Sequence, residues 1–424
     1  MKNKKNSRLA AAEIIFQWLE DESFPDRQLA KIEHDHAFIL EVVNGVVRNR
    51  LIFQWLEDSW LKSEPQLIFK SVLWVGLYQI LFMDNVEEYA VINETVNAAK
   101  EQRGGEGAAK MINAVLRRAQ REKADVFQRL EKQPDFIRLS HPEFLMERWK
   151  KTYGEADTLA LAEWNNEPAS TILRIEQSAV DAAEFIDKLR ENDIEPLMHP
   201  YSDKEIFLVL PRGVPVRKVP GYDEGWFTIQ DPATSVSVDL LAPRPGEAVL
   251  DACAAPGGKT AMMAGRMDKR GELVAMDMHD DRIAVLEQNQ KRLNLDWIDI
   301  VKGDARKPGN AFSNDRKFDA ILLDVPCLNT GVFKRRADAR WRVTEERIET
   351  ITNLQFEILT ACSELLTEKG RMVYSTCSLE PEENEGLVTR WIAQNPGFRL
   401  VKTGKAFPPD SGTDGAFAAL IRKK

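Results

Sequence analysis

Strand-like and helix-like segments alternate through the C-terminal half of this chain, and that alternation constrains the fold more than any other feature. Apolar runs of strand length are separated by longer stretches with the three-to-four spacing of amphipathic helices. This order is typical of a doubly wound, mainly parallel sheet. We therefore expect an α/β domain over residues 231–424, with strands at 248–252, 272–277, 298–304, 318–326 and 371–377 and helices at 259–267, 280–293 and 344–368.

Side chains at the ends of these strands indicate where a ligand binds. In parallel sheets that place is at the carboxyl ends of the strands, where the sequence has Asp251, Asp277, Asp304, Asp324 and Cys377. Asp277 can accept hydrogen bonds from both hydroxyls of a ribose, and Asp304 is placed to meet the edge of an adenine. One such aspartate alone is more often a helix cap, but three in register beside a glycine-rich loop favour a nucleotide-like cofactor.

That glycine-rich loop is CAAPGGKT, residues 253–260, and it follows the first of these strands. Gly257 and Gly258 let the backbone approach a ligand closely just before the N-terminus of a helix, which suits a carboxylate or a phosphate. A P-loop needs glycine at the position that Cys253 occupies, so the motif disfavours ATP hydrolysis.

Two of the four cysteines have a setting that suggests chemistry. The cysteines form no Cys-x-x-Cys pair and the histidines form no metal-binding motif, so we expect neither a disulfide framework nor a metal site. Cys327 and Cys377 directly follow predicted strands, whereas Cys362 lies in a helical run where packing is its expected role. Carbon 5 of cytosine becomes nucleophilic only after a thiolate adds to carbon 6. Two cysteines and an acid match that chemistry, and the residues alone leave open which cysteine attacks.

The first 135 residues show helical periodicity only, which predicts an all-α bundle over residues 1–135 with helices at 9–21, 37–59, 69–83, 91–100 and 108–123. Residues 97–123 carry seven basic residues against three acidic ones, in a chain whose net charge is −9. An RNA-binding face and a solvated helix face explain this excess about equally well.

The middle of the chain, residues 136–230, changes character. A strand, a helix and two strands are indicated at 171–175, 180–192, 194–199 and 205–210, which predicts a small α+β unit of split βαβ type. It has no aromatic RNA-binding signature, so it is either a connecting unit or a substrate-positioning one.

The sequence also predicts where the protein acts. Its longest uncharged apolar run, residues 71–83, is 13 residues long, short of the ~20 that cross a bilayer. The basic start is not followed by a secretory pattern. We therefore expect a soluble, cytoplasmic protein that does not contact membranes.

Together, CAAPGGKT, Asp277, Asp304, DVPC at 324–327 and STCSLEPEENE at 375–385 resemble the Nol1/Nop2/Sun family of RNA 5-methylcytosine methyltransferases. The segments VEEYAVINETVNAAK and GAAKMINAVLRR are similar to the end of a NusB-type RNA-binding domain. With that start, the whole chain resembles the bacterial members of the family that act on small-subunit ribosomal RNA. The resemblance implies a NusB-like bundle, a middle unit and a Rossmann-like class I methyltransferase domain.

The resemblance also implies roles for single residues. S-adenosylmethionine would be the cofactor, with its ribose at Asp277, its adenine side at Asp304, and its remaining contacts from Asp324 and from Cys253, Ala254, Ala255, Pro256, Gly257, Gly258 and Lys259. Cys377 would be the attacking thiolate and Cys327 would serve release of the product. Asp324 would lie between the cofactor and the target base, as a third catalytic residue.

Other interpretations stay open at this point. The basic cluster of Lys334, Arg335, Arg336, Arg340 and Arg342, with Trp341 among them, either binds RNA phosphate and stacks on a base or is a solvated loop. A non-catalytic RNA-binding factor built on the NusB-like domain is the alternative function, against which the intact Cys327, Cys377 and cofactor loop argue. The resemblance implies ribosomal RNA as a partner, and the sequence indicates no protein partner.

Overall fold

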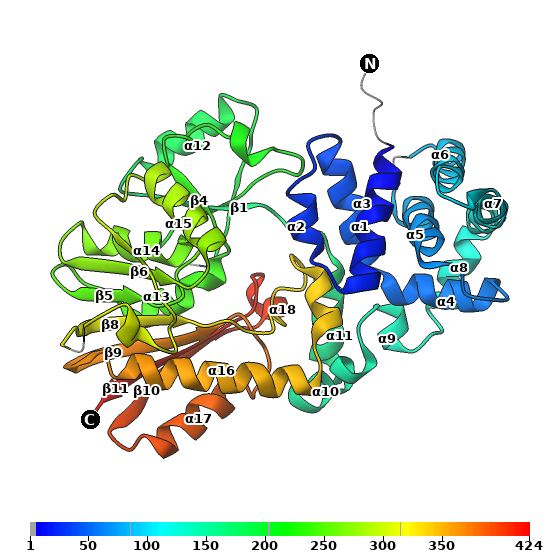
Figure 1. Ribbon diagram of the computed structural model, residues 1–424. Coiled ribbons are helices and arrows are strands. Elements are labelled where there is room, and N and C mark those ends of the chain that lie inside the picture. The colour runs from blue at the N-terminus through cyan, green and yellow to red at the C-terminus, as the bar shows by residue number, and fades with distance from the viewer. Residues whose placement is uncertain (1–5, 85, 202–203, 314) are drawn as a thin grey trace. The chain divides into compact units, whose positions relative to one another are not determined.

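A computed structural model describes residues 6–84, 86–201, 204–313 and 315–424 (Figure 1). The chain forms two compact units, one of Met1–Asn166 with Arg336–Trp341 and the other of Glu167–Arg335 with Arg342–Lys424. The boundaries at residues 135 and 230 suggested by the sequence describe a different, three-part division, which stays a prediction.

The first unit is a bundle of helices around one apolar core. Helix α5 (Leu67–Phe82) is buried at every position from Ser71 to Leu81, because this uncharged run is apolar on all sides. Four other helices pack against it: α1 (Ser7–Asp21), α3 (His36–Arg48), α6 (Glu88–Lys100) and α7 (Gly105–Arg121). The remaining helices are α2 (Pro25–Leu29), α4 (Arg50–Trp60), α8 (Lys123–Leu130), α9 (Asp135–Arg138), α10 (Glu143–Tyr153) and α11 (Glu155–Asn166). In the part of the chain that the structure describes, no helix is long and apolar enough to cross a membrane.

The single helix predicted over residues 37–59 is wrong, because the chain breaks at Asn49 into α3 and α4. Asn49 has φ −100° and ψ 21°, outside the helical range. Its side-chain amide donates to the carbonyl oxygen of Gly45 (2.8 Å) and so competes with the helical backbone.

Residues 336–341 contribute to the core of the helical unit, although they are distant from it in sequence. Ala337 is buried in that core, and the indole N–H of Trp341 donates to the carbonyl oxygen of Val47 (2.8 Å). The Arg340 guanidinium is fully buried and donates to the carbonyl oxygens of Ser140 and Asn165 (both 3.1 Å). The interpretation of Arg340 and Trp341 as RNA-binding side chains is therefore wrong, because both are committed to contacts inside the helical unit.

The second unit begins with a four-stranded antiparallel sheet in the order β2-β3-β1-β4. Its elements are β1 (Ile172–Ile175), α12 (Ala182–Arg190), β2 (Leu197–Met198), β3 (Phe207–Val209) and β4 (Phe227–Ile229). The sequence predicts all of these except β4, which pairs with β1.

The C-terminal sheet has seven strands in the order β10-β11-β9-β8-β5-β6-β7. These strands are β5 (Ala248–Asp251), β6 (Glu272–Asp277), β7 (Asp299–Lys302), β8 (Phe318–Asp324), β9 (Leu366–Thr376), β10 (Phe398–Ala406) and β11 (Ala416–Lys423). From β7 to β9 all neighbours are parallel, which confirms the predicted mainly parallel sheet. β11 runs antiparallel to both β9 and β10.

Helices cover both faces of this sheet (Figure 1). One core contains Val249 and Leu322 together with residues of α13, α14 and α15, and a second core contains Leu250 and Leu323 with residues of α16 and α17. Neighbouring residues of one strand thus face opposite cores. The helices are α13 (Ser235–Leu241), α14 (Gly258–Met267), α15 (Asp280–Arg292), α16 (Glu345–Ser363), α17 (Glu385–Gln394) and the short α18 (Pro408–Ser411). Short 3-10 turns lie at Val216–Lys218, Pro232–Thr234, Pro308–Asn310 and Ala337–Arg342.

Two features of this sheet differ from the prediction. The helix expected over residues 344–368 ends at Ser363, and β9 begins at Leu366. The strands β10 and β11 were not predicted. β10 lies at the edge of the sheet and most of its residues are exposed, so it lacks the apolar run of a central strand.

The order of the strands reverses next to β5. β6 and β7 extend the sheet on one side of β5, and the chain then returns to form β8 on the other side. Such a switch point opens a crevice at the carboxyl ends of the two strands. β5 ends there with Asp251, and β8 ends with Asp324.

Candidate active site

The loop between β5 and α14 has a conformation that its glycines and a buried aspartate determine. Gly257 has φ +100°, a left-handed value that glycine adopts without strain. A Cβ atom at Gly258 would lie 3.2 Å from Nε2 of Gln230, so only glycine allows this approach without a shift. The backbone N–H of Ala255 donates to Oδ2 of Asp277 (3.2 Å).

A cavity of about 270 Å³ lies beside this loop. Its lining includes most of the residues predicted to hold the cofactor, namely Cys253, Ala254, Ala255, Pro256, Gly258, Lys259 and Asp324. It also includes the strand-end residue Asp251 and Arg335 of the basic cluster. The rest of the lining consists of residues that the sequence did not point to: Ile172, Ile229, Gln230, Asp231, Thr234 and Asp414. Gly257, Asp277, Asp304, Cys327 and Cys377 are not part of this lining.

Asp277 and Asp304 differ in their surroundings. Asp277 is buried and accepts hydrogen bonds from the N–H groups of Ala255 and Met278, and Arg282 lies 3.3 Å from its Oδ2. It therefore shapes the loop after β5. Asp304 is partly exposed and accepts hydrogen bonds from the Arg306 side chain, which lower the pKa of its carboxyl group. The assignment of both residues to the cofactor stays a prediction.

Lys259 and Asp324 form an ion pair at the switch point, with 2.6 Å between Nζ and Oδ1. Burial acts to lower the pKa of Lys259, but Asp324, and to a smaller extent Cys377 and Asp251, raise it above its usual value. Burial raises the pKa of Asp251 to about 7, against a hydrogen bond from the Thr260 hydroxyl to its Oδ2 (2.7 Å). Lys259 thus places a positive charge beside Asp324, and this charge interacts with Cys377.

The structure brings Cys327 and Cys377 together. Their Sγ atoms lie 3.3 Å apart, within hydrogen-bond distance, and Cys377 Sγ lies 3.4 Å from Oδ1 of Asn329. The side-chain amide of Asn329 donates to the carbonyl oxygen of Cys327 (2.9 Å). The hydrogen bond with Cys377 and burial raise the pKa of the Cys327 thiol well above its usual value. Cys327 therefore holds its proton firmly.

The other two cysteines, Cys253 and Cys362, are not paired with a second thiol in this way. Cys362 is fully buried on α16, its thiol donates to the carbonyl oxygen of Ala305 (3.3 Å), and burial raises its pKa to about 12. Burial also raises the pKa of Cys253 well above its usual value. Among the described residues, no group of three or more His, Cys, Asp or Glu side chains could hold a metal ion.

Arg335 lies on the cavity between two acidic residues. Its guanidinium contacts Oδ2 of Asp231 (2.9 Å) and Oδ2 of Asp414 (2.7 Å), and these charges raise its pKa against the effect of burial. Lys334 pairs with Glu167 (2.8 Å). Two carboxylates thus contact its guanidinium, so Arg335 is not part of a merely solvated loop, and its contact with RNA phosphate stays a prediction.

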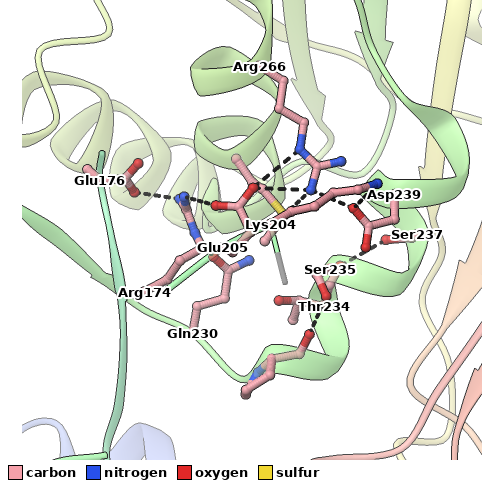
Figure 2. A network of polar contacts seen from close by, with 12 residues as sticks. Arg174, Glu176, Lys204, Glu205, Gln230, Thr234, Ser235, Ser237, Asp239 and Arg266 are labelled. Atoms are coloured by element: carbon pink, nitrogen blue, oxygen red, sulfur yellow. Dashed lines mark hydrogen bonds and ion pairs between the residues drawn. The ribbon is translucent and has the colours of Figure 1, made fainter. Parts of the chain in front are cut away.

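A polar network joins the four-stranded sheet to α14 and thereby to the cavity. Figure 2 shows the Glu205 carboxylate between the guanidinium groups of Arg174 and Arg266, with distances of 3.4 Å and 3.1 Å. Arg174 Nε also donates to Oε1 of Gln230 (2.7 Å), the side chain that faces Gly258. The middle sheet thus holds one wall of the cavity in place.

Glu383 is a further residue that the sequence did not point to. It lies in the run of acidic residues that follows Cys377, a composition that suggests a solvated loop, yet its exposure is 0%. Burial raises the pKa of Glu383 to about 7, against hydrogen bonds from Ser378, Gln355 and Leu328.

Comparisons with known proteins agree with the fold. A sequence model of the 16S rRNA methyltransferase RsmB/F family matches residues 238–421. A model of the NusB family matches residues 5–121, and one of the RsmF/B-like ferredoxin-like domain matches residues 141–217. These matches confirm the three components that the sequence motifs suggested.

Full-length relatives and solved structures extend this similarity. The ribosomal RNA small subunit methyltransferase B of Vibrio vulnificus (strain YJ016) is 34% identical over 436 residues, which cover 99% of this chain and 100% of the relative. The protein of the same name from Yersinia pestis bv. Antiqua (strain Angola) is 32% identical, and the match covers 100% of both chains.

Among solved structures, PH0851 superposes with a TM-score of 0.80 at 23% identity, covering 100% of both chains. A methyltransferase homolog protein from Pyrococcus horikoshii has a TM-score of 0.60 at 26% identity and covers 68% of this chain and 98% of its own. The identity to the Vibrio relative over the whole length decides the assignment: this chain belongs to the RsmB/F family of 16S rRNA methyltransferases.

Proposed function

We propose that this chain transfers a methyl group from S-adenosylmethionine to carbon 5 of a cytosine in small-subunit ribosomal RNA, through a covalent adduct on Cys377. The observation that carries the proposal is the pair of cysteine sulfurs 3.3 Å apart, directly after two neighbouring parallel strands. Two thiols so close together suit a reaction in which one sulfur adds to a base and the other assists its release.

The cavity beside the β5–α14 loop fits the cofactor chemically. Oδ1 of Asp251 is buried without a hydrogen-bond partner, and the loop offers the N-terminus of α14 to a carboxylate. We assign residues 253–259 to the amino-acid part of S-adenosylmethionine and Asp277 and Asp304 to its nucleoside. When bound, S-adenosylmethionine supplies a methyl group on a positively charged sulfur.

The charges around the two cysteines support Cys377 as the nucleophile. The hydrogen bond with Cys377 and burial raise the pKa of the Cys327 thiol, and the charge of Glu383 adds a smaller effect in the same direction. Cys377 interacts with the positive charge of Lys259. We therefore assign the attack on the base to Cys377, the cysteine that lies in the field of this cation. The thiolate, not the thiol, is the attacking species.

The reaction then follows from the chemistry of the pyrimidine ring. Cys377 Sγ adds to carbon 6, and carbon 5 becomes nucleophilic and takes the methyl group as the bond between that methyl group and the cofactor's sulfur breaks. The electron pair of that bond stays on the cofactor's sulfur, and carbon 5 then gives its proton to water or a nearby base. Breaking of the bond between carbon 6 and sulfur returns the electron pair to Cys377 and frees the base. We assign promotion of this last step to Cys327. We assign Asp324, which pairs with Lys259, a place between the cofactor and the target base.

The substrate must present its cytosine outside the base stack, because a stacked base cannot reach the cysteines. We assign the holding of ribosomal RNA to the basic face of α7, where Arg117 and Arg121 are exposed. The cytoplasm is the expected location of this reaction.

Bisulfite sequencing of small-subunit ribosomal RNA tests the proposal. Cells that lack the gene should lose 5-methylcytosine at a defined position, and the wild-type gene should restore it. A matched control strain that carries the Cys362→Ala variant should keep the modification, because Cys362 lies away from the cysteine pair. An unchanged 5-methylcytosine pattern in the deleted strain would refute the proposed reaction.

A further inference from the structure

A buried carboxyl group connects the two loops that carry the cysteines. Glu383 is fully buried in the loop between β9 and α17. Its Oε1 accepts a hydrogen bond from the hydroxyl of Ser378, the residue after Cys377. Its Oε2 accepts one from the backbone N–H of Leu328 (3.1 Å), the residue after Cys327. One carboxyl group is therefore bonded next to each of the two sulfurs.

Gln355 extends this connection to the other side of Cys327. It is fully buried on α16, and its Nε2 donates both to Oε2 of Glu383 (2.8 Å) and to the carbonyl oxygen of Pro326 (2.9 Å). The peptide groups before and after Cys327 are thus both held, directly or through Gln355, by the carboxyl group of Glu383.

Other hydrogen bonds between the two loops act further from Cys327. The backbone N–H of Leu379 donates to Thr330 Oγ1 (2.8 Å), and that of Gly331 donates to the carbonyl oxygen of Cys377 (3.0 Å). These contacts reach the first loop at residues 330 and 331. Closer to Cys327, Asn329 donates to the carbonyl oxygen of Cys327 (2.9 Å), and the N–H of Val325 donates to the carbonyl oxygen of Ser375 (3.1 Å). Glu383 and Gln355 add to these contacts a connection on both sides of Cys327.

We propose that Glu383 is a positioning residue whose carboxyl group sets the separation of the Cys327 and Cys377 sulfurs. It touches neither the cavity nor the reacting sulfurs, and it acts through the peptide groups beside them. Its removal leaves the buried N–H of Leu328 without this acceptor, and it leaves Gln355 and Ser378 with only their second contacts, to the carbonyl oxygen of Pro326 and to Thr330 Oγ1. We therefore expect the two loops to shift. The consequence for methyl transfer rests on the proposed function, but the effect on the sulfurs does not.

The separation of the sulfurs can be measured without RNA by treating the full chain with oxidised glutathione. One cysteine thiolate displaces one glutathione and forms a mixed disulfide, and the second cysteine then displaces the other glutathione and closes the 327–377 disulfide. Peptide mapping by mass spectrometry gives both species over time. The rate of closure from the mixed disulfide reports how close the two sulfurs are.

Glu383→Ala should slow this closure about tenfold or more, because small displacements of reacting atoms have large effects on such rates. Glu383→Gln should close at nearly the wild-type rate. Its amide oxygen can accept from Leu328 and Gln355, and its NH₂ group can donate to Ser378. Glu382→Ala is the matched control, since Glu382 is exposed in the same loop, and it should be unchanged. Closure by Glu383→Ala at the wild-type rate would overturn the proposal.

Two further measurements complete the test. If Glu383→Ala does not fold, Ser378→Ala removes the bond to Oε1 together with the contacts of this hydroxyl to Thr330 Oγ1 and the Glu380 N–H, and its closure should still be slower than in the wild type. Equal closure in that variant would also overturn the proposal. In methyl transfer, Glu383→Ala should lower kcat with the KM for RNA unchanged. If closure behaves as expected but the wild type forms no 5-methylcytosine, the proposed function fails and the positioning role of Glu383 stands.

Discussion

The two regions of this chain that we relate to RNA, the basic helix α7 and the loops after β8 and β9, are built in opposite ways. In α7, Ile112, Leu116 and Ala119 fill the core, while Arg117 and Arg121 are exposed to solvent. In the cysteine loops, polar side chains such as Ser378 and Glu383 are fully buried and hydrogen-bonded to one another.

The difference predicts two kinds of response to substitution. Exposed charges act on RNA through a field to which each contributes a part, so their loss should have graded and salt-dependent effects. Buried groups act through single atoms in fixed places, so the loss of one atom should have a large effect that salt does not change. Substitutions in the two regions can therefore test the contrast directly.

The largest effect is expected at the cysteine pair. Cys377→Ala should reduce methylation about a thousandfold or more and form no covalent adduct, since without a thiolate carbon 5 never becomes nucleophilic. Cys327→Ala should still attack and transfer the methyl group but release the RNA poorly. It should accumulate a protein–RNA complex that survives denaturing gel electrophoresis.

Cys362→Ala is the control for both variants and should remain active. A trapped complex with Cys377→Ala, together with an inert Cys327→Ala, would reverse the roles of the two sulfurs. If both Cys377→Ala and Cys327→Ala still methylate RNA, covalent catalysis is excluded. The expected difference between the buried cysteine loops and the exposed face of α7 would then also disappear.

An intermediate effect is expected at Asp277, which shapes the cofactor loop and is proposed to bind the ribose. Asp277→Ala should weaken S-adenosylmethionine binding by ~1.5–3 kcal/mol, which is roughly tenfold to a hundredfold in affinity. Isothermal titration calorimetry measures it, with Asp281→Ala, an exposed carboxylate on α15, as the control. Equal affinities of the Asp277 variant and the wild type would show that this aspartate has no part in cofactor binding.

The smallest effect is expected on α7. Replacing Arg117 and Arg121 by Glu in the full chain should reduce the slope of log K against log salt by about 0.7–0.9 for each RNA phosphate that these side chains neutralise in the wild type. Arg118→Gln should change the slope less, because Glu122 and the ring of Trp60 already contact this guanidinium. Gel-shift titrations at several salt concentrations provide the slopes. A slope that the double variant leaves intact would mean that α7 is only a solvated face.

The sequence predicted well those features that local patterns determine. The strands β5, β6 and β8 lie where apolar runs are bounded by turn residues, and the adjacency of parallel strand ends led us to place Cys327 and Cys377 at one site. The structure brings these sulfurs together. Their catalytic roles, like those of the cofactor-binding residues, stay predictions.

Features that depend on distant partners could not be predicted. Arg335 meets Asp231 and Asp414 across separations of 104 and 79 residues, and nothing near Arg335 in the sequence indicates either carboxylate. Basic composition led us to treat residues 334–342 as one cluster, either RNA-binding or solvated, although Arg340 is buried. Composition records the charge of a residue but not the partners that neutralise or bury it.

The inclusion of residues 336–341 in the helical unit has a consequence for the order in which the protein is synthesised. Arg340 donates to the carbonyl oxygen of Ser140, 200 residues earlier in the chain. The carbonyl groups of Ser140 and Asn165 therefore lack the Arg340 donor when the helices that carry them are first synthesised. They gain it only after most of the second unit has left the ribosome. The helical unit begins the chain, but its last core residues are among the later ones to be translated.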